Sequence, residues 1–185
     1  YSILTGHHIV GNNIHDTGQL HKGTGAIEMY YGGNTIEYNY LHDLPRWGVA
    51  LPFNQGGQNT VRYNEIRRAC LETADCGPIH TSPNVGDGGE IAHNLMVDCP
   101  GMSSGISGNL RSPSGTWGIY LDCYANGYNV HDNIIVGPMV GGYVVAGPDN
   151  TFENNVVVNC GLYQAVPFFV PNITANMEVF RNIFY

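Results

Sequence analysis

The stretch NTIEYNYL at residues 34–41, with its near copy NTVRYNEI at residues 59–66, decides the fold of this chain. In both, an aliphatic residue is followed after two others by an asparagine, and a second apolar residue stands two positions beyond that asparagine. The same phrase recurs outward along the chain as HIVGNNI (8–14), GEIAHNLM (89–96), YNVHDNII (128–135), NTFENNVVV (150–158) and MEVFRNIF (177–184). Seven copies of one short strand phrase predict a solenoid whose repeats bury their apolar faces on each other.

The asparagine of each phrase sets the register of the repeat. Successive copies lie 27, 25, 30, 39, 22 and 27 residues apart. We expect these side chains to turn inward at a bend and to hydrogen-bond from one repeat to the next, because Asn tolerates left-handed backbone and its amide can stack. The register asparagines are Asn12, Asn39, Asn64, Asn94, Asn133, Asn155 and Asn182.

A second short apolar run follows most phrases and has the period-two pattern of a half-buried strand. These runs are AIEM (26–29), GVAL (48–51), PIHT (78–81), GIYL (118–121) and YVVA (143–146). The pattern predicts an all-β chain, a right-handed parallel β-helix of about seven coils. Leucine-rich repeats need an apolar residue five positions before the asparagine, which most of these phrases lack. Left-handed β-helices need hexapeptide repeats, which these spacings do not show, so both alternatives fail. Because the chain starts and stops inside a coil, we expect residues 1–185 to be one β-helix domain, incomplete at both ends.

Composition narrows the functions that such a chain can have. There are 7 Lys and Arg against 15 Asp and Glu, for a net charge of −8. This balance, without a basic cluster, argues against binding to nucleic acid, to a membrane surface or to polyuronates. No apolar run approaches the roughly twenty residues of a membrane span.

The five cysteines do not have metal-ligand spacing, and we expect neither a metal nor a cofactor. Cys70, Cys99 and Cys160 each follow the second apolar residue of a phrase, so we expect them to line one inner corner. A Cys70–Cys99 disulfide is an alternative if the protein is exported.

Chemistry is expected where the repeat is interrupted, because binding and catalytic groups concentrate in loops on a rigid scaffold. The intervals of 30 and 39 residues are the longest. When the second strands are aligned by Ile27, Val49, Ile79 and Ile119, His80 and Tyr120 fall in one outward column with Glu28 and Ala50. The next outward column holds Asp122 with Tyr30, Pro52 and Ser82. Asp75 approaches Asp122 only if the chain bends at Cys76 and Gly77.

The stretches ETADCGPIH (72–80), GIYLDCYANGYNVHDNII (118–135) and GPDNTFENNVVVNC (147–160) resemble segments of right-handed β-helix glycoside hydrolases, particularly glycoside hydrolase family 141. The resemblance covers roughly residues 70–161 and implies a pair of catalytic aspartates, which would be Asp75 and Asp122. Pro78, His80 and Cys123 depart from the family pattern, and Cys123 replaces the second acid of an Asp-Asp pair. If that acid is the working one, the chain is inactive.

The resemblance implies hydrolysis of a polysaccharide or its side chains, with two carboxyl groups flanking the scissile bond. Glu72 is then a reserve acid, His80 orients a carboxylate or binds a sugar hydroxyl, and Arg111 binds an acidic sugar group. Trp117 and Tyr120, with Trp47 and Tyr124, offer aromatic faces to sugar rings. The expected location is extracellular or periplasmic, and the oligomeric state stays open.

Two other classes of function fit the same fold. A polysaccharide lyase or epimerase needs a basic group beside the acids, for which only Arg111 is convincing. A non-catalytic carbohydrate-binding protein or adhesin would use the long loops for recognition. For Asp75 and Asp122 the alternative role is capping of turns, and we interpret His42, Asp43, His131 and Asp132 as turn residues.

Overall fold

The chain forms parallel β-sheets in a computed structural model that describes residues 5–53, 56–83, 85–137, 139–145, 147–162 and 175–185. The described residues contain strands and no helix. Three parallel sheets account for all the strands except one antiparallel hairpin. The expectation of an all-β chain with parallel strands is therefore confirmed.

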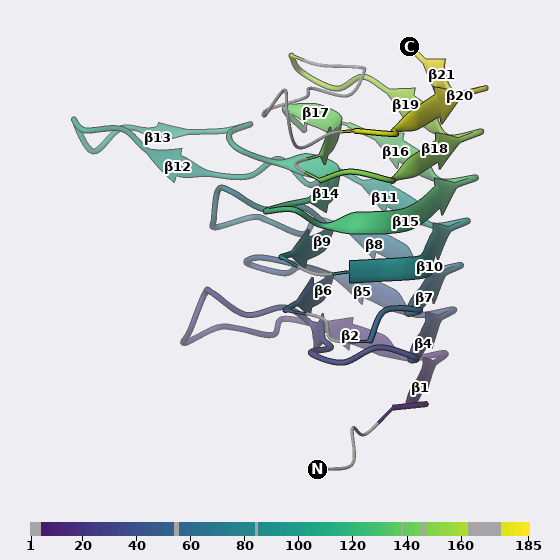
Figure 1. Ribbon diagram of the computed structural model, residues 1–185. Helices are drawn as coiled ribbons and strands as arrows, with labels where there is room; N and C mark the ends of the chain where they lie inside the picture. Colours follow the sequence, from purple (N-terminus) through teal and green to yellow (C-terminus); the bar gives the residue numbers. More distant parts are fainter. Residues whose placement is uncertain (1–4, 54–55, 84, 138, 146, 163–174) are drawn as a thin grey trace.

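Two sheets of seven strands are built from the two halves of the repeated phrase. The β1 sheet consists, in spatial order, of β1 (His8–Val10), β4 (Thr35–Glu37), β7 (Thr60–Arg62), β10 (Val85–Ala92), β15 (Asn126–His131), β18 (Thr151–Glu153) and β20 (Glu178–Phe180). The β2 sheet consists of β2 (Asn13–His15), β5 (Tyr40–His42), β8 (Glu65–Arg67), β11 (Leu95–Val97), β16 (Ile134–Val136), β19 (Val156–Val158) and β21 (Ile183–Phe184). Spatial order follows chain order, so each repeat lies directly on the one before it (Figure 1).

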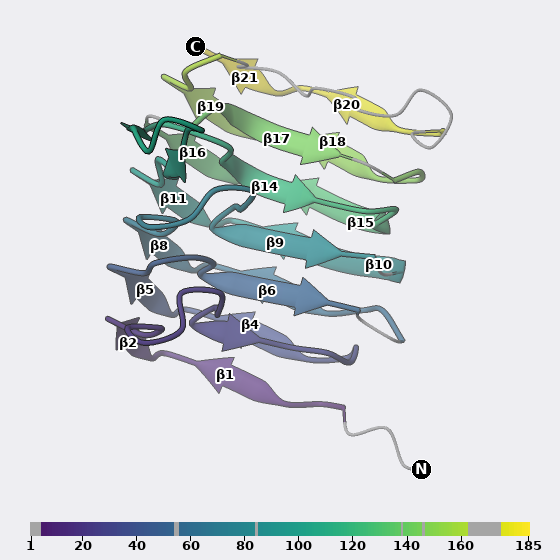
Figure 2. The same cartoon turned by 90° about the vertical axis from the view of Figure 1, so that its left-hand side faces the viewer.

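The second apolar runs form the third sheet, of five strands. The β3 sheet consists of β3 (Ile27–Glu28), β6 (Val49–Pro52), β9 (Ile79–Ser82), β14 (Trp117–Leu121) and β17 (Gly141–Val145). The predicted run YVVA falls in β17, except that its last residue lies outside the described part of the chain. Figure 2 shows β6, β9 and β14 stacked between strands of the other two sheets. Each of the first five repeats thus contributes one strand to each sheet.

Alternation within the phrase explains its two strands. In the 34–41 phrase Ile36 and Leu41 point inward and are fully buried, whereas their strand neighbours are partly exposed. Between them Tyr38 has a φ of 57°, which bends the chain from β4 into β5. The expectation that the register asparagine itself is left-handed is wrong, because the left-handed residue is the one before it. Asn39 follows Tyr38 with its amide turned inward.

The predicted asparagine ladder is present. The Nδ2 of each register asparagine from Asn12 to Asn155 donates to Oδ1 of the next, over 2.9–3.0 Å. Each of these Oδ1 atoms also accepts a backbone N–H from the repeat below. The ladder holds the repeats in register whatever the length of chain between them.

A second, shorter ladder was missed. Asn34 donates to Asn59 one repeat above, 3.1 Å away, and Asn150 accepts the backbone N–H of Tyr128. These positions precede the β1-sheet strands and lie five residues before a register asparagine.

The core between the sheets is apolar and includes the expected cysteine corner. Cys70 and Cys99 are fully buried and Cys160 is 6% exposed. All five cysteines are free thiols, so the alternative of a Cys70–Cys99 disulfide is not observed.

The 39-residue interval leaves the sheets as a hairpin. Strands β12 (Ser103–Ser104) and β13 (Leu110–Arg111) pair antiparallel and project from the stack (Figure 1).

Candidate functional site

The outer face of the β3 sheet brings together most of the residues expected at the site. Ile27, Val49, Ile79 and Ile119 are register partners, as the alignment of the sequence predicted. His80 consequently pairs with Tyr120 on adjacent strands, and their rings meet edge to face with centroids 5.0 Å apart.

This outward column is covered rather than solvated. Trp47 stacks on His80 with centroids 5.0 Å apart, and Trp117 lies 4.8 Å from Tyr120. His80 is 6% exposed and Tyr120 is 8% exposed. The two tryptophans, which lie just before β6 and at the start of β14 on either side of β9, thus shield the polar groups between them from water.

Asp75 reaches this face because the chain bends just after it. Asp75 has a φ of 52°, and Cys76 then forms a parallel bridge with Thr116. Gly77 permits the close approach of β14, since a Cβ there would lie 2.5 Å from the carbonyl oxygen of Trp117. As a result the Tyr120 hydroxyl donates a hydrogen bond of 3.0 Å to Oδ1 of Asp75.

Asp122 lies near the same tyrosine and beside His80. Its Oδ2 is 3.8 Å from Nε2 of His80, and its Oδ1 accepts the backbone N–H of Cys123 at 2.7 Å. Burial opposes ionisation of Asp122, but the nearby His80 and the hydrogen bond from Cys123 outweigh it, and the pKa of Asp122 falls below its usual value. Asp122 is therefore an ionised carboxylate at neutral pH.

Tyr120 responds to both aspartates. Burial, then the charges of Asp122 and Asp75, and then hydrogen bonds to these two carboxyl groups raise the pKa of Tyr120 far above its usual value. The phenol therefore stays protonated and serves as a hydrogen-bond donor between two acids. His80 Nδ1 and Trp47 Nε1 are buried without a hydrogen-bond partner in the described part of the chain, so a water or a ligand is needed to satisfy them.

Two expected substrate-binding residues lie apart from this cluster. Glu72 is exposed and pairs with Lys22 over 2.9 Å. Arg111 is exposed on the hairpin strand β13. Their position in long loops did not bring them to Tyr120.

Glu72 instead helps to line a pocket of about 470 Å³ between its own loop and the hairpin. Arg46, Thr73, Ala74, Met102, Ser103, Ser104 and Leu110 complete the lining.

Arg46 connects this pocket to the cluster and was missed in the sequence. Its guanidinium lies 4.2 Å from the centroid of the Trp47 ring and donates a hydrogen bond of 3.0 Å to the carbonyl oxygen of Asp75. The signal available in the sequence was a cation next to an aromatic residue, in the Pro45-Arg46-Trp47 segment that leads into β6.

In the part of the chain that the structure describes, neither aspartate belongs to a group of side chains placed to hold a metal ion. Among the described residues, the group of His, Cys, Asp or Glu side chains close enough to hold an ion lies elsewhere, at the bend between the β1 and β2 sheets.

No family model matches this chain, and no significant match was found among curated proteins or solved structures. The likeness to glycoside hydrolases stays a resemblance of short motifs, and functional proposals depend on the geometry. No helix in the described part of the chain has the length and apolar character that a membrane span requires.

Proposed function

We propose that this chain hydrolyses glycosidic bonds in a polysaccharide or its side chains, with Asp75 and Asp122 as the catalytic carboxyl groups. The observation that carries the proposal is the Tyr120 hydroxyl, which bonds to Asp75 and interacts with Asp122. Both carboxyl groups thus act on one phenol, and we infer that they lie close enough to flank one glycosidic bond. Glycosidases hold their two carboxyl groups about 5 to 9.5 Å apart.

The environments of the two acids suggest different roles. Asp122, whose pKa is lowered, is the ionised base or nucleophile. We assign the remaining role, protonation of the leaving oxygen, to Asp75. Tyr120 positions Asp75 through its hydrogen bond, and His80 positions Asp122. The pKa of the Cys123 thiol is raised by burial and by Asp122, so this residue takes no part in proton transfer near neutral pH.

Aromatic faces beside the acids supply the sugar-binding surface. Trp117 and Trp47 are partly exposed and flank the Tyr120 and His80 pair. A longer substrate would extend past Trp47 along Arg46 toward the pocket that contains Glu72, with Arg111 of the hairpin beyond it. Polysaccharide substrates are found mostly outside the cytoplasm, so the proposal includes an extracellular or periplasmic location.

The proposed scaffold is a right-handed parallel β-helix of about seven coils. Three parallel sheets whose strands recur in the same order support it, because a parallel crossover is right-handed in nearly all proteins. On such a scaffold the cluster lies on the outer surface, where a long polymer can approach from the side.

The test is release of reducing ends from a panel of neutral and acidic plant and microbial polysaccharides. Asp75→Asn and Asp122→Asn are each expected to lower the rate by at least about 100-fold, the usual effect of a positioned acid or base. Asparagine accepts the left-handed backbone of Asp75, so the fold is retained. Asp16→Asn is the matched control, because Asp16 is exposed and has a φ of 52° like Asp75 but is distant in the chain from Tyr120.

The outcomes separate the candidate functions. Cleavage that depends on both aspartates supports hydrolysis, and the anomer released first, observed by proton NMR, gives the stereochemical course. Binding without cleavage would make the chain a carbohydrate-binding β-helix. Unsaturated products, detected by their ultraviolet absorbance, would indicate the lyase alternative. A folded chain that neither binds nor cleaves any of these polymers contradicts the proposal.

A further inference from the structure

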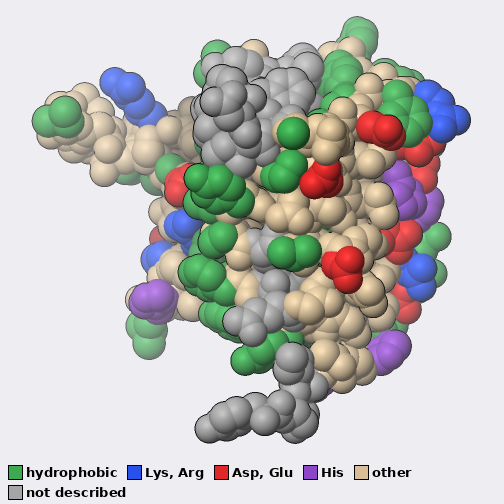
Figure 3. All heavy atoms as spheres, in the orientation of Figure 1, with side chains coloured by type: hydrophobic (Ala, Val, Ile, Leu, Met, Phe, Trp, Pro, Cys, Tyr) green, Lys and Arg blue, Asp and Glu red, His purple; other side chains and the backbone are tan. Residues whose placement is uncertain are grey.

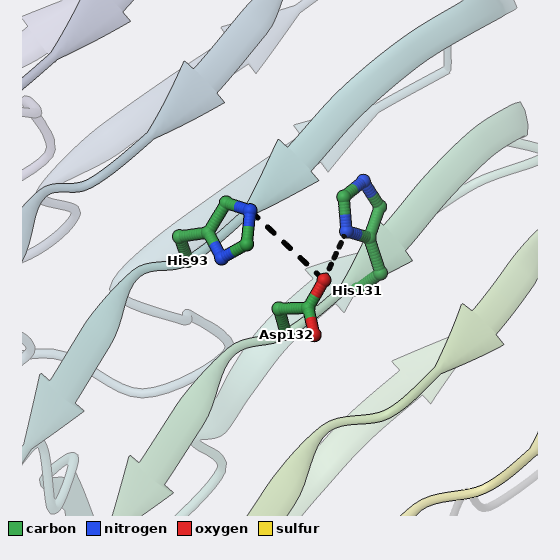
Figure 4. Close-up of side chains that lie close together, drawn as sticks. All are labelled: His93, His131 and Asp132. Carbon is green, nitrogen blue, oxygen red and sulfur yellow. Dashed lines mark hydrogen bonds and ion pairs between the residues drawn. The ribbon is translucent and has the colours of Figure 1, made fainter.

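We propose that His93, His131 and Asp132 form a binding site for a divalent first-row transition-metal ion such as Zn²⁺. The three residues lie at the bend between the β1 and β2 sheets, His93 after β10 and the other two at the end of β15. Figure 4 shows their side chains pointing toward one another from adjacent repeats. One donor atom from each lies within 4.8 Å of the other two.

The donor spacing is close to what an ion requires. Nδ1 of His131 lies 2.8 Å from Oδ2 of Asp132, and Nε2 of His93 lies 3.9 Å from the same oxygen. Ligand bonds of about 2.0–2.2 Å in a tetrahedron put donor atoms about 3.3 Å apart. The first distance must open and the second close by about half an ångström each, and the donor atoms of the two histidines, which lie within 4.8 Å of each other, must approach by up to about 1.5 Å, which rotation of these partly exposed side chains allows.

The ligands are held by neighbours that do not coordinate. Oε1 of Glu90 lies 3.2 Å from Nε2 of His131, so this ring can donate from Nε2 and direct its Nδ1 lone pair at the ion. Such a carboxylate–histidine–metal arrangement is the usual support of a metal ligand. His93 stacks flat on Tyr63 with centroids 4.7 Å apart, and Asn154 donates to the other oxygen of Asp132.

Charge favours a cation at this place. Acidic, basic and histidine side chains gather along the right-hand edge of Figure 3, the side on which β10 and β15 end. The carboxylate of Glu90 lies on one side of the His131 ring and that of Asp132 on the other, while Arg62, 3.8 Å from Glu90, offsets only part of this negative charge. Two imidazoles and one carboxylate suit Zn²⁺, Co²⁺, Ni²⁺ or Cu²⁺, whereas Ca²⁺ and Mg²⁺ require more oxygen ligands.

A bound ion would fasten two repeats together where the chain between them is longest. His93 and Asp132 each precede a register asparagine, Asn94 and Asn133, and the interval between these is 39 residues. The side chains of the three ligands are 28–37% exposed, so water completes the coordination. The ion therefore acts as a structural cross-link between repeats.

A similar pair elsewhere in the chain lacks the third donor. Nδ1 of His42 lies 2.7 Å from Oδ2 of Asp43, and Asp43 is left-handed like Asp132. Arg68, however, donates to both carboxylate oxygens of Asp43 and fills the place that a second imidazole would need. This pair is a control built into the same scaffold.

The experiment is titration of EDTA-treated protein with Zn²⁺ by isothermal calorimetry, alongside the melting temperature with and without Zn²⁺. We expect one ion per chain and a melting temperature that Zn²⁺ raises and EDTA restores. His93→Tyr and Asp132→Asn should each weaken binding at least about tenfold. Both variants keep the left-handed backbone, since Tyr63 and Asn154 occupy the same position in other repeats. Asp43→Asn should bind Zn²⁺ as the unaltered chain does.

Three results would overturn the site. The first is no saturable binding up to millimolar Zn²⁺, and the second is equal binding by the unaltered chain, His93→Tyr and Asp132→Asn. The third is equal weakening by Asp43→Asn, which would mean that scattered surface histidines bind the ion. Circular dichroism of each variant confirms that a loss of binding is not a loss of fold.

Discussion

Removing one amide from the middle of the asparagine ladder should destabilise the protein strongly. In Asn94, Nδ2 donates to the carbonyl oxygen of Val61 and to Asn133, while Oδ1 accepts from the backbone N–H and Nδ2 of Asn64. Asn94 is 1% exposed, so water cannot replace these partners. The substitution Asn94→Ala breaks all four hydrogen bonds at once.

The magnitude follows from the groups that are left unpaired. The amide Nδ2 of Asn64 keeps a bond to Ile36, and Oδ1 of Asn133 keeps the backbone N–H of residue 94. The backbone N–H of Asn64 loses its acceptor, and the carbonyl oxygen of Val61 loses the donor on Asn94, without replacement. An unsatisfied buried polar group costs about 1–3 kcal/mol, so we expect Asn94→Ala to lower the free energy of unfolding by about 2–6 kcal/mol.

The assay is urea denaturation followed by circular dichroism, with Asn12→Ala as the control. Asn12 belongs to the same ladder but is exposed at its first rung, so its substitution should cost about 1 kcal/mol or less. If the two substitutions cost the same, or if Asn94→Ala costs less than about 1 kcal/mol, burial of the ladder is not what stabilises the stack.

Other predictions concern the core and the titrating groups. Ile91 is fully buried, so Ile91→Ala should cost about 2–5 kcal/mol in the same urea experiment. The unfolded chain releases the Tyr120 proton above about pH 10 while the folded chain retains it, so stability falls as the pH rises further; Tyr120→Phe should flatten this fall in melts recorded from pH 9 to 11, roughly. Hydrogen bonds from Arg68 and then His42 lower the pKa of Asp43, so the stability that Asp43 contributes is present above about pH 4 and lost as the pH falls; the difference between Asp43→Asn and the unaltered chain should shrink in acid melts. Cys123 is the one exposed cysteine, and native alkylation followed by peptide mass mapping should modify it alone, more slowly at pH 8 than a free thiol because burial and Asp122 raise its pKa.

The repeat and its register could be predicted because they are encoded locally. The spacing of Ile36, Asn39 and Leu41 in one phrase already implies two short strands with an inward amide, and the other copies repeat it. The alignment of Ile79 with Ile119 was correct for the same reason. The left-handed residue was misplaced by one position, since the copies carry Gly, Tyr, His, Asp, Asn or Arg there and no single residue type reveals it.

Burial on the outer face could not be predicted from the period. The pattern predicted that His80 and Tyr120 point outward, and they do. Trp47 and Trp117 lie before the aligned runs, however, and cover these two side chains. The approach of Asp75 depends on the bridge between Cys76 and Thr116, a pairing across two repeats that no single phrase contains. Glu72 and Arg111 were expected at the site because they lie in long loops, and loop position does not specify which side chains meet.

Within their own repeat, the interpretation of His131 and Asp132 as turn residues was correct, because Asp132 has the left-handed φ of 54°. Their third partner, His93, precedes Asp132 by 39 residues, and the hydrogen bond from Asn94 to Asn133 makes the two neighbours. His80 and Tyr120 likewise come from two adjacent repeats, 40 residues apart, in a different sheet. The extra residues of this interval enter the β12–β13 hairpin and leave the register unchanged. Both candidate sites therefore arise from contacts between repeats, so a search for function in such a chain should compare equivalent positions of successive repeats before it compares neighbours in sequence.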